Sequence, residues 1–598
     1  MAELPKGGIM VKLSKLVLYI FCAGLIGNAT SPWLWAGKVK TLKVPYQYST
    51  IQSAVDAAKE GDTVLVYPGK YMENIIFRGP NITLKSAEGP AVTKISGGNL
   101  GLVMYFANRE NLNMVVDGFK IVKGYTNDNG GAIYIANQSS PTIKNCIIKS
   151  NYAKKGAGIC VIENSAPIIE NCIIEKNTAK KQGAGIFVFN SSPSIQNNRI
   201  DWNTVLKNEK DISDGAGIFC AGDDSNPVIT NNTIQNNHAE VWGGGIIITG
   251  CHATITDNIV SNNFAVWHGA GITIVHNNHL TQGSTLVQNN DISNNTVQKI
   301  GAGVYLENAV NVVVRENTIS NNQVVPGGGY ADRDAGGIYA YNTSGVIEYN
   351  TVSDNTSKYM AAMDITDGCK LTIEHNTITG NVAEQRWIII LTAGDNKFRY
   401  NTVTGNHLED GAEGFGLLGG AVFVFQGNAE LASNLIAEND GGLGGFQSTF
   451  SAVNNTIVNN NALLGGLSGG MIIYQSTVDT LANNIFSGNE GYHIYEYLST
   501  FTVSYNNFNN NDRGILYKLK SDGSPSYYTS VQSFNALSYA DNNFAVSPSF
   551  ESASYALTED SKLVDSGNDS VELPTFDVMG NDRISGNTVD IGAYEYQL

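Results

Sequence analysis

Several residue types are scarce in this 598-residue sequence: charged residues make up 15%, and there are only 14 prolines and 7 cysteines. Low charge together with 42% hydrophobic residues excludes intrinsic disorder, which requires high charge and few apolar residues. The cysteines show no CxxC spacing, and so few of them in so long a chain exclude a disulfide scaffold and a zinc ribbon. We therefore expect an ordinary apolar core.

The net charge of −17 at pH 7 restricts the partners. Nucleic acid is excluded as a main partner, because phosphate binding requires basic surfaces. Ca²⁺ and neutral glycans stay open, since acidic loops hold Ca²⁺ and an acidic protein does not repel an uncharged sugar. A polyanionic substrate would require one cleft that is locally basic.

Long apolar runs are scarce as well, and the one membrane-type segment lies at the N-terminus. Three lysines in the first fifteen residues precede the apolar run 16–26, and small residues follow near Ala29 and at Ala36. This order is typical of a secretory signal. We expect residues 1–36 to be a signal peptide. The mature chain is then an exported protein, secreted or on the cell surface, monomeric and without a transmembrane helix.

The middle of the chain repeats the pattern N-x-[IV]-x-x-N, as in Asn317–Asn322 and Asn376–Asn381. Thirteen copies, about 28 residues apart on average, begin at positions 146, 172, 198, 232, 258, 290, 317, 350, 376, 401, 434, 455 and 484. Cys146 and Cys172 stand in the Asn place of the first two copies, and we expect them to be small buried side chains. Stacked asparagines satisfy one another's amides, so the repeat predicts asparagine ladders.

A Gly-Ala-Gly-like step followed by an alternating apolar triplet precedes most copies, as in 156–161 and 301–306. The alternation predicts a short half-buried strand, and repeats this short bury their apolar faces only by stacking. The sequence thus predicts an all-β, single-stranded right-handed parallel β-helix of about thirteen coils or more, with an N-terminal capping helix and strand and a β-rich C-terminal tail. The expected parts are 37–100 (cap and first coils), 101–515 (β-helix) and 516–598 (capping or surface-association segment).

Both ends of the chain resemble a known family. The segment 50–71 begins with TIQ, continues with GDTV and ends with PGKY, and its first residues have helical apolar spacing. The segment 580–595 carries GxxRxxG followed by DIGAYE. With the Asn/Gly coils, these segments resemble the pectin-lyase-like superfamily of right-handed parallel β-helices. The resemblance implies the fold and export. The superfamily includes polysaccharide lyases, glycoside hydrolases, uronate epimerases and adhesins, but this sequence reproduces none of their catalytic signatures.

The middle residue of each triplet, and the second residue after it, are expected to point outward. In the central coils these positions place aromatic and carboxylate side chains on one exposed face: Tyr305, Glu307, Tyr339, Tyr341 and Asp364. Residues just before the glycine steps are expected to line its edge: Trp242, Trp267, His268, Asp334 and Arg386. Exposed aromatics stack on sugar rings and carboxylates act as acid and base, so the pattern predicts a glycan groove. The alternative is that the in-register aromatics only pack on one another.

Within this groove we assign substrate binding to Tyr305, Tyr339, Tyr341, Trp242 and Trp267. The catalytic candidates are Asp364, Glu307, Asp334, Arg386 and His268. Glu307 and Asp364 lie two coils apart, about 10 Å, which suits the carboxylate pair of a glycosidase. A lyase or epimerase would instead use Arg333, Arg386 or His268 as base, with Ca²⁺ on carboxylates.

No metal site is predicted, because the histidines that lie close together in sequence, His252, His268, His276 and His279, are expected to be solvated in loops. The sequence therefore predicts a secreted or cell-surface β-helix protein that binds a polysaccharide on its outer sheet. Lyase, hydrolase or epimerase activity is left open. The alternative is a non-enzymatic, adhesin-like rod. A Ca²⁺-stabilised scaffold would need acidic repeats in register, which the sequence lacks.

Overall fold

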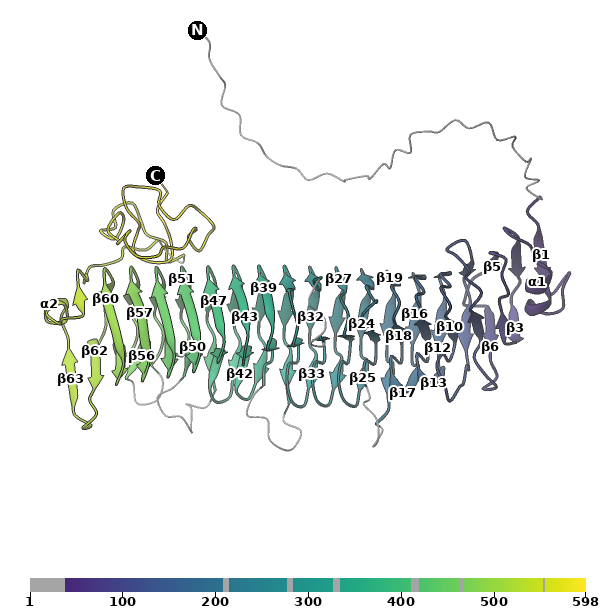
Figure 1. Ribbon diagram of the computed structural model, residues 1–598, viewed down its shortest axis with the longest axis horizontal. Helices are drawn as coiled ribbons and strands as arrows, with labels where there is room; N and C mark the ends of the chain where they lie inside the picture. The colour runs from purple at the N-terminus through teal and green to yellow at the C-terminus, as the bar shows by residue number, and fades with distance from the viewer. Residues whose placement is uncertain are drawn as a thin grey trace, which may run out of the picture. The chain divides into compact units, whose positions relative to one another are not determined.

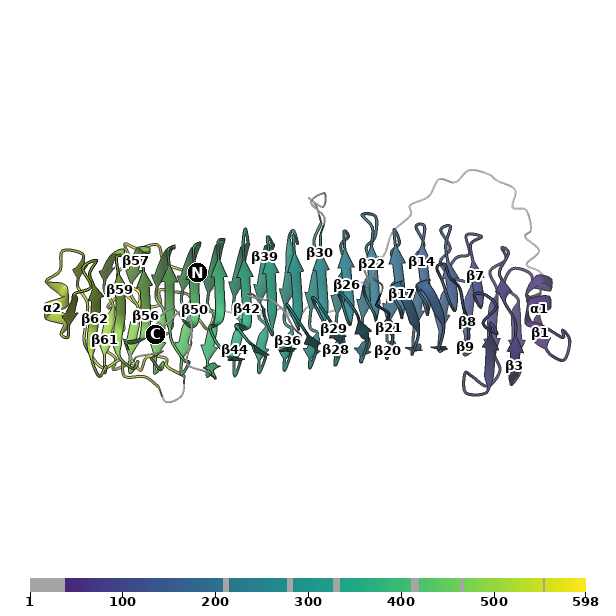
Figure 2. The same cartoon turned by 90° about the horizontal axis from the view of Figure 1, so that it is seen from below.

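The structure is a computed structural model that describes residues 38–207, 214–276, 283–325, 334–409, 419–462, 467–551 and 554–597. The predicted signal peptide lies outside the described residues. From Lys40 onward the chain forms one compact unit, which winds as a parallel β-helix as the sequence predicts (Figure 1, Figure 2). No helix in this described part is long and apolar enough to cross a bilayer.

Each coil contributes strands to three long sheets, here called A, B and C, and most coils add a strand to a fourth sheet, D. One coil runs through β11 (Thr142–Lys144) in A, β12 (Ile147–Lys149) in B, β13 (Tyr152–Lys155) in D and β14 (Ile159–Ile162) in C. Among the described residues, sheet A has 19 strands, from β1 (Thr41–Val44) to β64 (Ala540–Asp541), and sheet B has 17, from β3 (Gly69–Met72) to β61 (Asn507–Asn509). In the same described part, sheet C has 18 strands, from β4 (Ile75–Ile76) to β63 (Pro525–Tyr528), and sheet D has 10, from β13 to β49 (His407–Leu408). Inward-facing Ile, Val and Leu from all coils form the core.

Two ladders of buried asparagines hold the coils in register. They run from Asn198 to Asn543 along the corner between sheets A and B, and from Asn151 to Asn489 along the corner after sheet B. The Asn376 amide donates to the Asn401 side-chain oxygen at 3.0 Å and to the Ile347 carbonyl at 2.8 Å, and Asn376 is 1% exposed. Losing such a buried amide leaves its neighbours unpaired. The predicted ladder is confirmed.

The β-helix extends beyond the thirteen sequence copies at both ends. Asn506 and Asn543 continue the first ladder after Asn484, with amide-to-oxygen distances of 2.8 and 3.2 Å. Before β11, sheet A begins with coils that carry no asparagine anchor: β1, β2 (Thr63–Val66), β5 (Thr83–Ser86) and β8 (Val115–Asp117). Cys146 and Cys172 are each 1% exposed, as expected for small residues at the start of the ladder.

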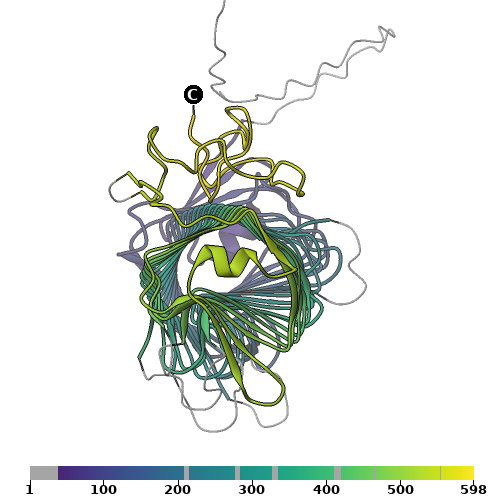
Figure 3. The same ribbon diagram turned by 90° about the vertical axis from the view of Figure 1, so that its left-hand side faces the viewer.

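Both open ends of the solenoid are covered. At the N-terminal end, α1 (Ile51–Ala57) starts at the N-cap Thr50. The Gln52 side chain accepts from the Ile76 N–H at 2.8 Å and donates to the Ile76 carbonyl at 3.1 Å, which closes the free edge of β4. At the other end, β62 (Gly514–Leu519) pairs antiparallel with β63, and α2 (Val531–Asn535) lies across the last coils (Figure 3).

The C-terminal segment, 542–597, packs against the outside of sheet B. Apolar residues of the segment and of the sheet form one cluster, which includes Leu435, Val458, Ile485, Leu557, Leu563 and Ile591. Arg583, 3% exposed, donates to the backbone carbonyls of Asp590, Gly592 and Ala593 and so holds the chain's last turn. Of the predicted tail 516–598, the part up to Asp541 carries β62, β63 and β64, and the described part of 542–597 carries isolated bridges between single residues.

Candidate functional site

The central aromatic and carboxylate residues are in register, as the repeat predicts, but three of them are buried. In β34 (Val304–Glu307), β38 (Ile338–Tyr341) and β42 (Met360–Thr366), Tyr305 lies opposite Tyr339, and Tyr339 lies opposite Asp364. Their exposed fractions are 4%, 6% and 1%. The expectation that these three residues share an exposed face is therefore wrong. We call this in-register row of outward side chains, from Tyr105 to Tyr517, the outer column of sheet C.

The backbone of the glycine steps covers the outer column. Gly301 has a φ of +70°, and a Cβ placed on it would lie 2.9 Å from the Tyr305 ring and 3.3 Å from the Tyr339 Cβ. Gly269, with a φ of +62°, lies over Thr273 and Tyr305 in the same way. Because these two steps lie over the outward side chain of their own coil and of the next, Tyr305 and Tyr339 leave the core and are still shielded from water.

Aromatic rings of the column and of the residues just before the glycine steps also cover one another's faces. The His268 ring lies 5.2 Å from Trp242 and 5.0 Å from Tyr305, and Tyr305 lies 5.1 Å from Tyr339 with an interplanar angle of 12°. A ring with a neighbour on each face has no surface left for a sugar, which needs an open ring face. In these coils the arrangement favours packing of the aromatics on one another.

Other predicted site residues keep contact with solvent. Tyr341 is 36% exposed and Trp267 is 46% exposed, with the Lys299 ammonium 4.0 Å from the centre of the Trp267 ring. Glu307 is half-buried and accepts a hydrogen bond from the Tyr305 hydroxyl at 2.8 Å.

The guanidinium of Arg386 lies 4.7 Å from the centre of the Tyr359 ring and 5.7 Å from that of Trp387. This residue therefore packs on aromatic rings next to the outer column. Arg333 lies outside the described residues. The binding and catalytic roles assigned from the sequence to all ten central residues stay predictions.

Burial shifts the pKa of two catalytic candidates. Asp334 is 3% exposed, and burial raises its pKa to about 6, although it accepts N–H bonds from residues 358–360 at 2.9 to 3.2 Å. Burial, with a smaller effect of Lys299, lowers the pKa of His268 to about 4. Asp334 thus holds the backbone at the start of β42, and the His268 imidazole is neutral at pH 7.

One of the histidines expected to be solvated is instead buried. His276 is 1% exposed, and its Nδ1 accepts the Val310 N–H at 3.2 Å. His279 lies outside the described residues. Where the structure describes the chain, no three His, Cys, Asp or Glu side chains gather as metal ligands. Ca²⁺ binding stays a prediction, and the described residues contain no cluster of ligands for it.

The outer column is open near its N-terminal end. Tyr105 of β7 (Met104–Phe106) lies opposite Tyr134 of β10 (Ile133–Ile135), with ring centres 5.4 Å apart and an interplanar angle of 3°. Both tyrosines are half-buried. The column continues with the smaller side chains Ile76 on one side and Cys160 on the other. The outer faces of this tyrosine pair therefore border smaller neighbours instead of further rings.

Two adjoining hollows lie beside the tyrosine pair. The larger, about 490 Å³, is lined by Ile76, Leu100 and Tyr105 among others. The smaller, about 230 Å³, is lined by Tyr105, Tyr134 and Asp128 among others. The hollows share three lining residues, and we call them together the N-terminal groove. An aromatic wall, apolar side chains and a few polar groups are what sugar and small-molecule sites combine.

Local structure holds the groove in shape. Gly130 has a φ of +77°, and a Cβ there would lie 2.8 Å from the Tyr134 ring, so only glycine allows this close approach. The Asn74 amide donates to the Leu102 carbonyl at the groove wall. Burial raises the pKa of Tyr134 to about 12, which keeps its hydroxyl protonated and able to donate a hydrogen bond.

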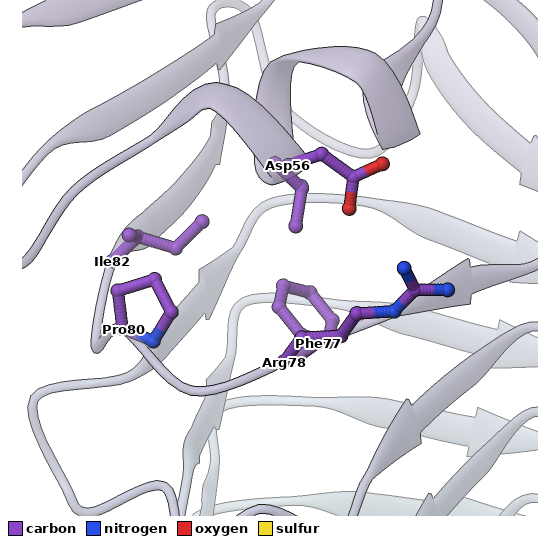
Figure 4. A pocket seen from close by; sticks show the side chains of 6 residues that line it. Asp56, Phe77, Arg78, Pro80 and Ile82 are labelled. Carbon is purple, nitrogen blue, oxygen red and sulfur yellow. The ribbon is translucent and has the colours of Figure 1, made fainter.

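A separate hollow of about 390 Å³ lies between α1 and the first coils (Figure 4). Its floor is formed by Val55, Phe77 and Ile82, which are at most 5% exposed. The Asp56 carboxylate and the Arg78 guanidinium stand at its opening. This hollow shares no lining residue with the N-terminal groove and has no aromatic pair.

Comparisons with known proteins support the fold. Residues 114–285, 279–403 and 386–526 match the model of the family described as the right-handed β-helix region. No curated protein sequence matches the chain.

Solved structures with a similar fold are distant. The PL6 family alginate lyase AlyGC is 11% identical, with 85% of this chain and 100% of that chain covered and a TM-score of 0.27. PfbA, a surface adhesin of Streptococcus pneumoniae, is 12% identical, with 80% and 90% covered and a TM-score of 0.25. Pectate lyase Pel9A is 12% identical, with 93% and 96% covered and a TM-score of 0.20. TM-scores this low carry no argument about activity.

Proposed function

Because the chain belongs to the right-handed β-helix family, whose stacked coils present long outer faces, we propose that it is a glycan-binding protein that uses the N-terminal groove. The observation that carries the proposal is the tyrosine pair Tyr105 and Tyr134. Both rings are half-buried and line the hollow of about 230 Å³, and Tyr105 also lines the adjoining hollow of about 490 Å³. In the column the pair is flanked by Ile76 and Cys160. The larger volume suits a small ligand or a few sugar units.

The groove supports binding better than hydrolysis. Among the described residues that line the two hollows, Asp128 is the one carboxylate. Hydrolysis of a glycosidic bond requires two carboxyl groups on opposite sides of it. The central candidates Glu307 and Asp364 lie in other coils, far along the axis. We therefore propose recognition of a polysaccharide or cell-surface glycan, with no chemical step assigned to the groove.

Export and surface attachment belong to the same proposal. The signal-like segment 1–36 directs the chain out of the cell, and the C-terminal segment provides for association with the cell surface. The protein acts there as a monomer, since both ends of its solenoid are covered by α1 and α2.

A structural rod is the second candidate, and the burial of the central column favours it. If the aromatics throughout the solenoid serve packing alone, no glycan binds to any outer face. The two candidates therefore differ in whether the groove residues affect glycan binding without affecting the fold.

A glycan array probed with the full chain and with Tyr134→Ala tests the proposal. Removing one stacking ring is expected to weaken binding about 5- to 150-fold, because such a contact contributes about 1–3 kcal/mol. Tyr349→Ala is the matched control, since Tyr349 is 54% exposed and lies in the central coils, far from the groove. Absence of any glycan ligand, or equal binding by Tyr134→Ala and the unchanged protein, would support the rod.

A further inference from the structure

The charge of the chain is divided between its two ends. Residues 38–207 contain 20 lysines and arginines and 12 aspartates and glutamates, a net charge of +8. Residues 208–598 contain 14 basic and 41 acidic residues, a net charge of −27. Exposed charges farther apart than the Debye length, about 8 Å at physiological salt, are largely screened from one another, so the first coils present a basic surface of their own.

Three lysines form a row on the outer face of sheet B in the first coils. Lys70 of β3 lies opposite Lys94 of β6 (Thr93–Ser96), and Lys94 lies opposite Lys120 of β9 (Lys120–Val122). Their side chains alternate with residues that point into the core, so all three point outward. Lys70 is exposed and the other two are half-buried. We call these three residues the lysine row.

Among the described residues, no carboxylate forms an ion pair with the lysine row. Other lysines of the first coils have such partners: the Lys85 ammonium lies 3.8 Å from the Asp117 carboxylate, and that of Lys149 lies 2.7 Å from Glu175. Like charges on adjacent strands, which lie about 4.8 Å apart, destabilise a sheet. An anionic surface placed against the row would remove this cost.

Two apolar side chains project into solvent beside the lysine row. Met72 lies on the same outer face of β3 as Lys70 and is 74% exposed, and Leu100, at the corner after β6, is 83% exposed. These are the two highest values among the large hydrophobic residues that the structure describes. A Cβ placed on Gly98 would lie 3.4 Å from the Met72 Sδ and 3.8 Å from the Leu100 Cδ1, so the two side chains lie close together. We call Met72 and Leu100 the apolar tip.

The same face of sheet B is covered in later coils by the chain itself. There the C-terminal segment lies over the sheet and buries Leu435 of β52 (Leu435–Ala437) and Ile485 of β58 (Ile485–Ser487) (Figure 1). Its apolar contacts with sheet B lie in these coils, and neither the lysine row nor the apolar tip belongs to them. The first coils therefore present cations and apolar side chains where the later coils present a surface that is already occupied.

We propose that the lysine row and the apolar tip dock the first coils on an anionic lipid bilayer. The ammonium groups of the row contact lipid phosphates, and Met72 and Leu100 enter the layer between headgroups and acyl chains. Basic residues near an anionic leaflet and apolar side chains buried in its interface both add to affinity. The acidic coils after residue 207 are repelled by the same surface, so contact is confined to this end.

This inference goes beyond the proposed glycan binding, because it assigns a lipid partner to sheet B. Leu100 also lines the larger hollow of the N-terminal groove. Docking through Leu100 therefore places the groove next to the membrane surface, where a glycan carried by that surface is within reach.

Vesicle binding tests the proposal. The chain from residue 37 onward is used, because the apolar run 16–26 would itself enter lipid and because the compact unit begins at Lys40. Vesicles of phosphatidylcholine, alone or with about 30% phosphatidylglycerol, are titrated in flotation assays at about 50 and 200 mM salt. Binding to the anionic vesicles is expected to be at least about ten-fold tighter and to weaken as salt rises, because contacts between lysines and phosphates are screened. Equal binding to both vesicles, or to neither, overturns the inference.

Substitution of the lysine row tests its part in docking. The row variant replaces its three lysines: Lys70→Gln, Lys94→Gln and Lys120→Gln. The matched control replaces three exposed lysines of the acidic part: Lys370→Gln, Lys397→Gln and Lys520→Gln. Both change the net charge by the same amount. The row variant is expected to weaken binding to anionic vesicles by about ten-fold or more, and the control is expected to leave it unchanged. Equal effects of the two variants would overturn the assignment to this row.

A fluorescent label tests whether the apolar tip enters the bilayer. The six cysteines among the described residues are buried, so an environment-sensitive dye attaches to the new thiol of Leu100→Cys. Its emission is expected to shift to shorter wavelength with anionic vesicles, whereas the dye on Tyr349→Cys, in the central coils, is expected to show no shift. Absence of a shift at residue 100 contradicts insertion. If the chain ignores vesicles and sediments as a dimer that the row variant dissociates, the row binds a second copy and the lipid assignment is wrong.

Discussion

Tyr105 and Tyr134 in the first coils and Tyr305 and Tyr339 in the central coils stand in the same outer column, yet the first pair borders a groove and the second is buried. The difference lies in the backbone before each strand. The coil of Tyr305 carries the glycine step at Gly301, which lies over two tyrosines. The coil of Tyr134 has the same step at Gly130, which lies over Tyr134, but the preceding coil of Tyr105 lacks it, and Leu100 there is 83% exposed. A side chain that leaves the core is thus exposed only where the neighbouring corner leaves it uncovered.

The largest expected effect comes from truncating a covered ring. Tyr339→Ala is expected to destabilise the fold by about 3–5 kcal/mol, because it leaves a ring-sized cavity between Tyr305 and Asp364. Chemical denaturation monitored by circular dichroism measures this loss. Tyr341→Ala, in the same strand but 36% exposed, is the control and is expected to cost less than about 1 kcal/mol. Similar losses for both variants would mean that the column is not covered.

Low pH is expected to lower the stability of the fold by protonating His268, whose ring packs against Tyr305 of the outer column. Its folded pKa of about 4 is below the usual value of 6.5, so the native state favours the neutral ring. The stabilisation is therefore complete above pH 6.5 and is lost as the pH falls toward 4, by up to about 3 kcal/mol. The difference in unfolding free energy between the unchanged protein and His268→Gln, measured from pH 7 to 4, isolates this residue. A constant difference would contradict the burial of His268.

A smaller effect is expected from the covering backbone. Gly301→Ala is expected to cost about 1–3 kcal/mol, from the left-handed conformation and from contact of the new Cβ with Tyr305. Gly89→Ala is the matched control, since Gly89 has a φ of +84° and a Cβ there would meet nothing within 4 Å. Both glycines have a left-handed backbone, so the extra loss of thermal stability in Gly301→Ala over Gly89→Ala measures the contact between the new Cβ and Tyr305. Equal losses would show that the step does not press on the ring.

The smallest loss of stability is expected from truncating a ring of the Tyr105–Tyr134 pair beside the groove. Tyr134→Ala should cost about 1 kcal/mol, because a half-buried ring contributes less than a covered one. Thermal unfolding of Tyr134→Ala and Tyr339→Ala in parallel compares the two ends of the column directly. A loss at Tyr134 as large as that at Tyr339 would place both rings in the same environment and remove the distinction.

The fold was predictable because its determinants repeat. The spacing of Asn317, Asn376 and their equivalents predicted the ladder, and the helical spacing after Thr50 predicted α1. Asn506 and Asn543 were missed because the residues around them break the pattern, although both continue the ladder. The first coils carry no asparagine anchor, so the thirteen copies do not include them, although the sequence assigned residues 37–100 to a cap and first coils.

The site was less predictable, because alternation says which side chains leave the core and does not say what covers them. Tyr305 and Tyr339 alternate correctly and are covered by the backbone of Gly301, a contact between coils. Apolar residues did not mark the surface that the C-terminal segment covers. Leu435 and Ile485 lie under the segment, but the same row of sheet B has Ile147 and Ile259 in coils outside it.

The asparagine ladder also determines how such a protein can change length in evolution. Bonded asparagines are separated by 21 to 37 residues, while their amide-to-oxygen distances stay between 2.8 and 3.2 Å. Extra residues therefore lie in loops at the other corners, and the geometry of the ladder stays the same. Insertions and deletions survive either as loops or as complete turns of the solenoid, and a whole turn can be gained or lost by recombination between neighbouring repeats.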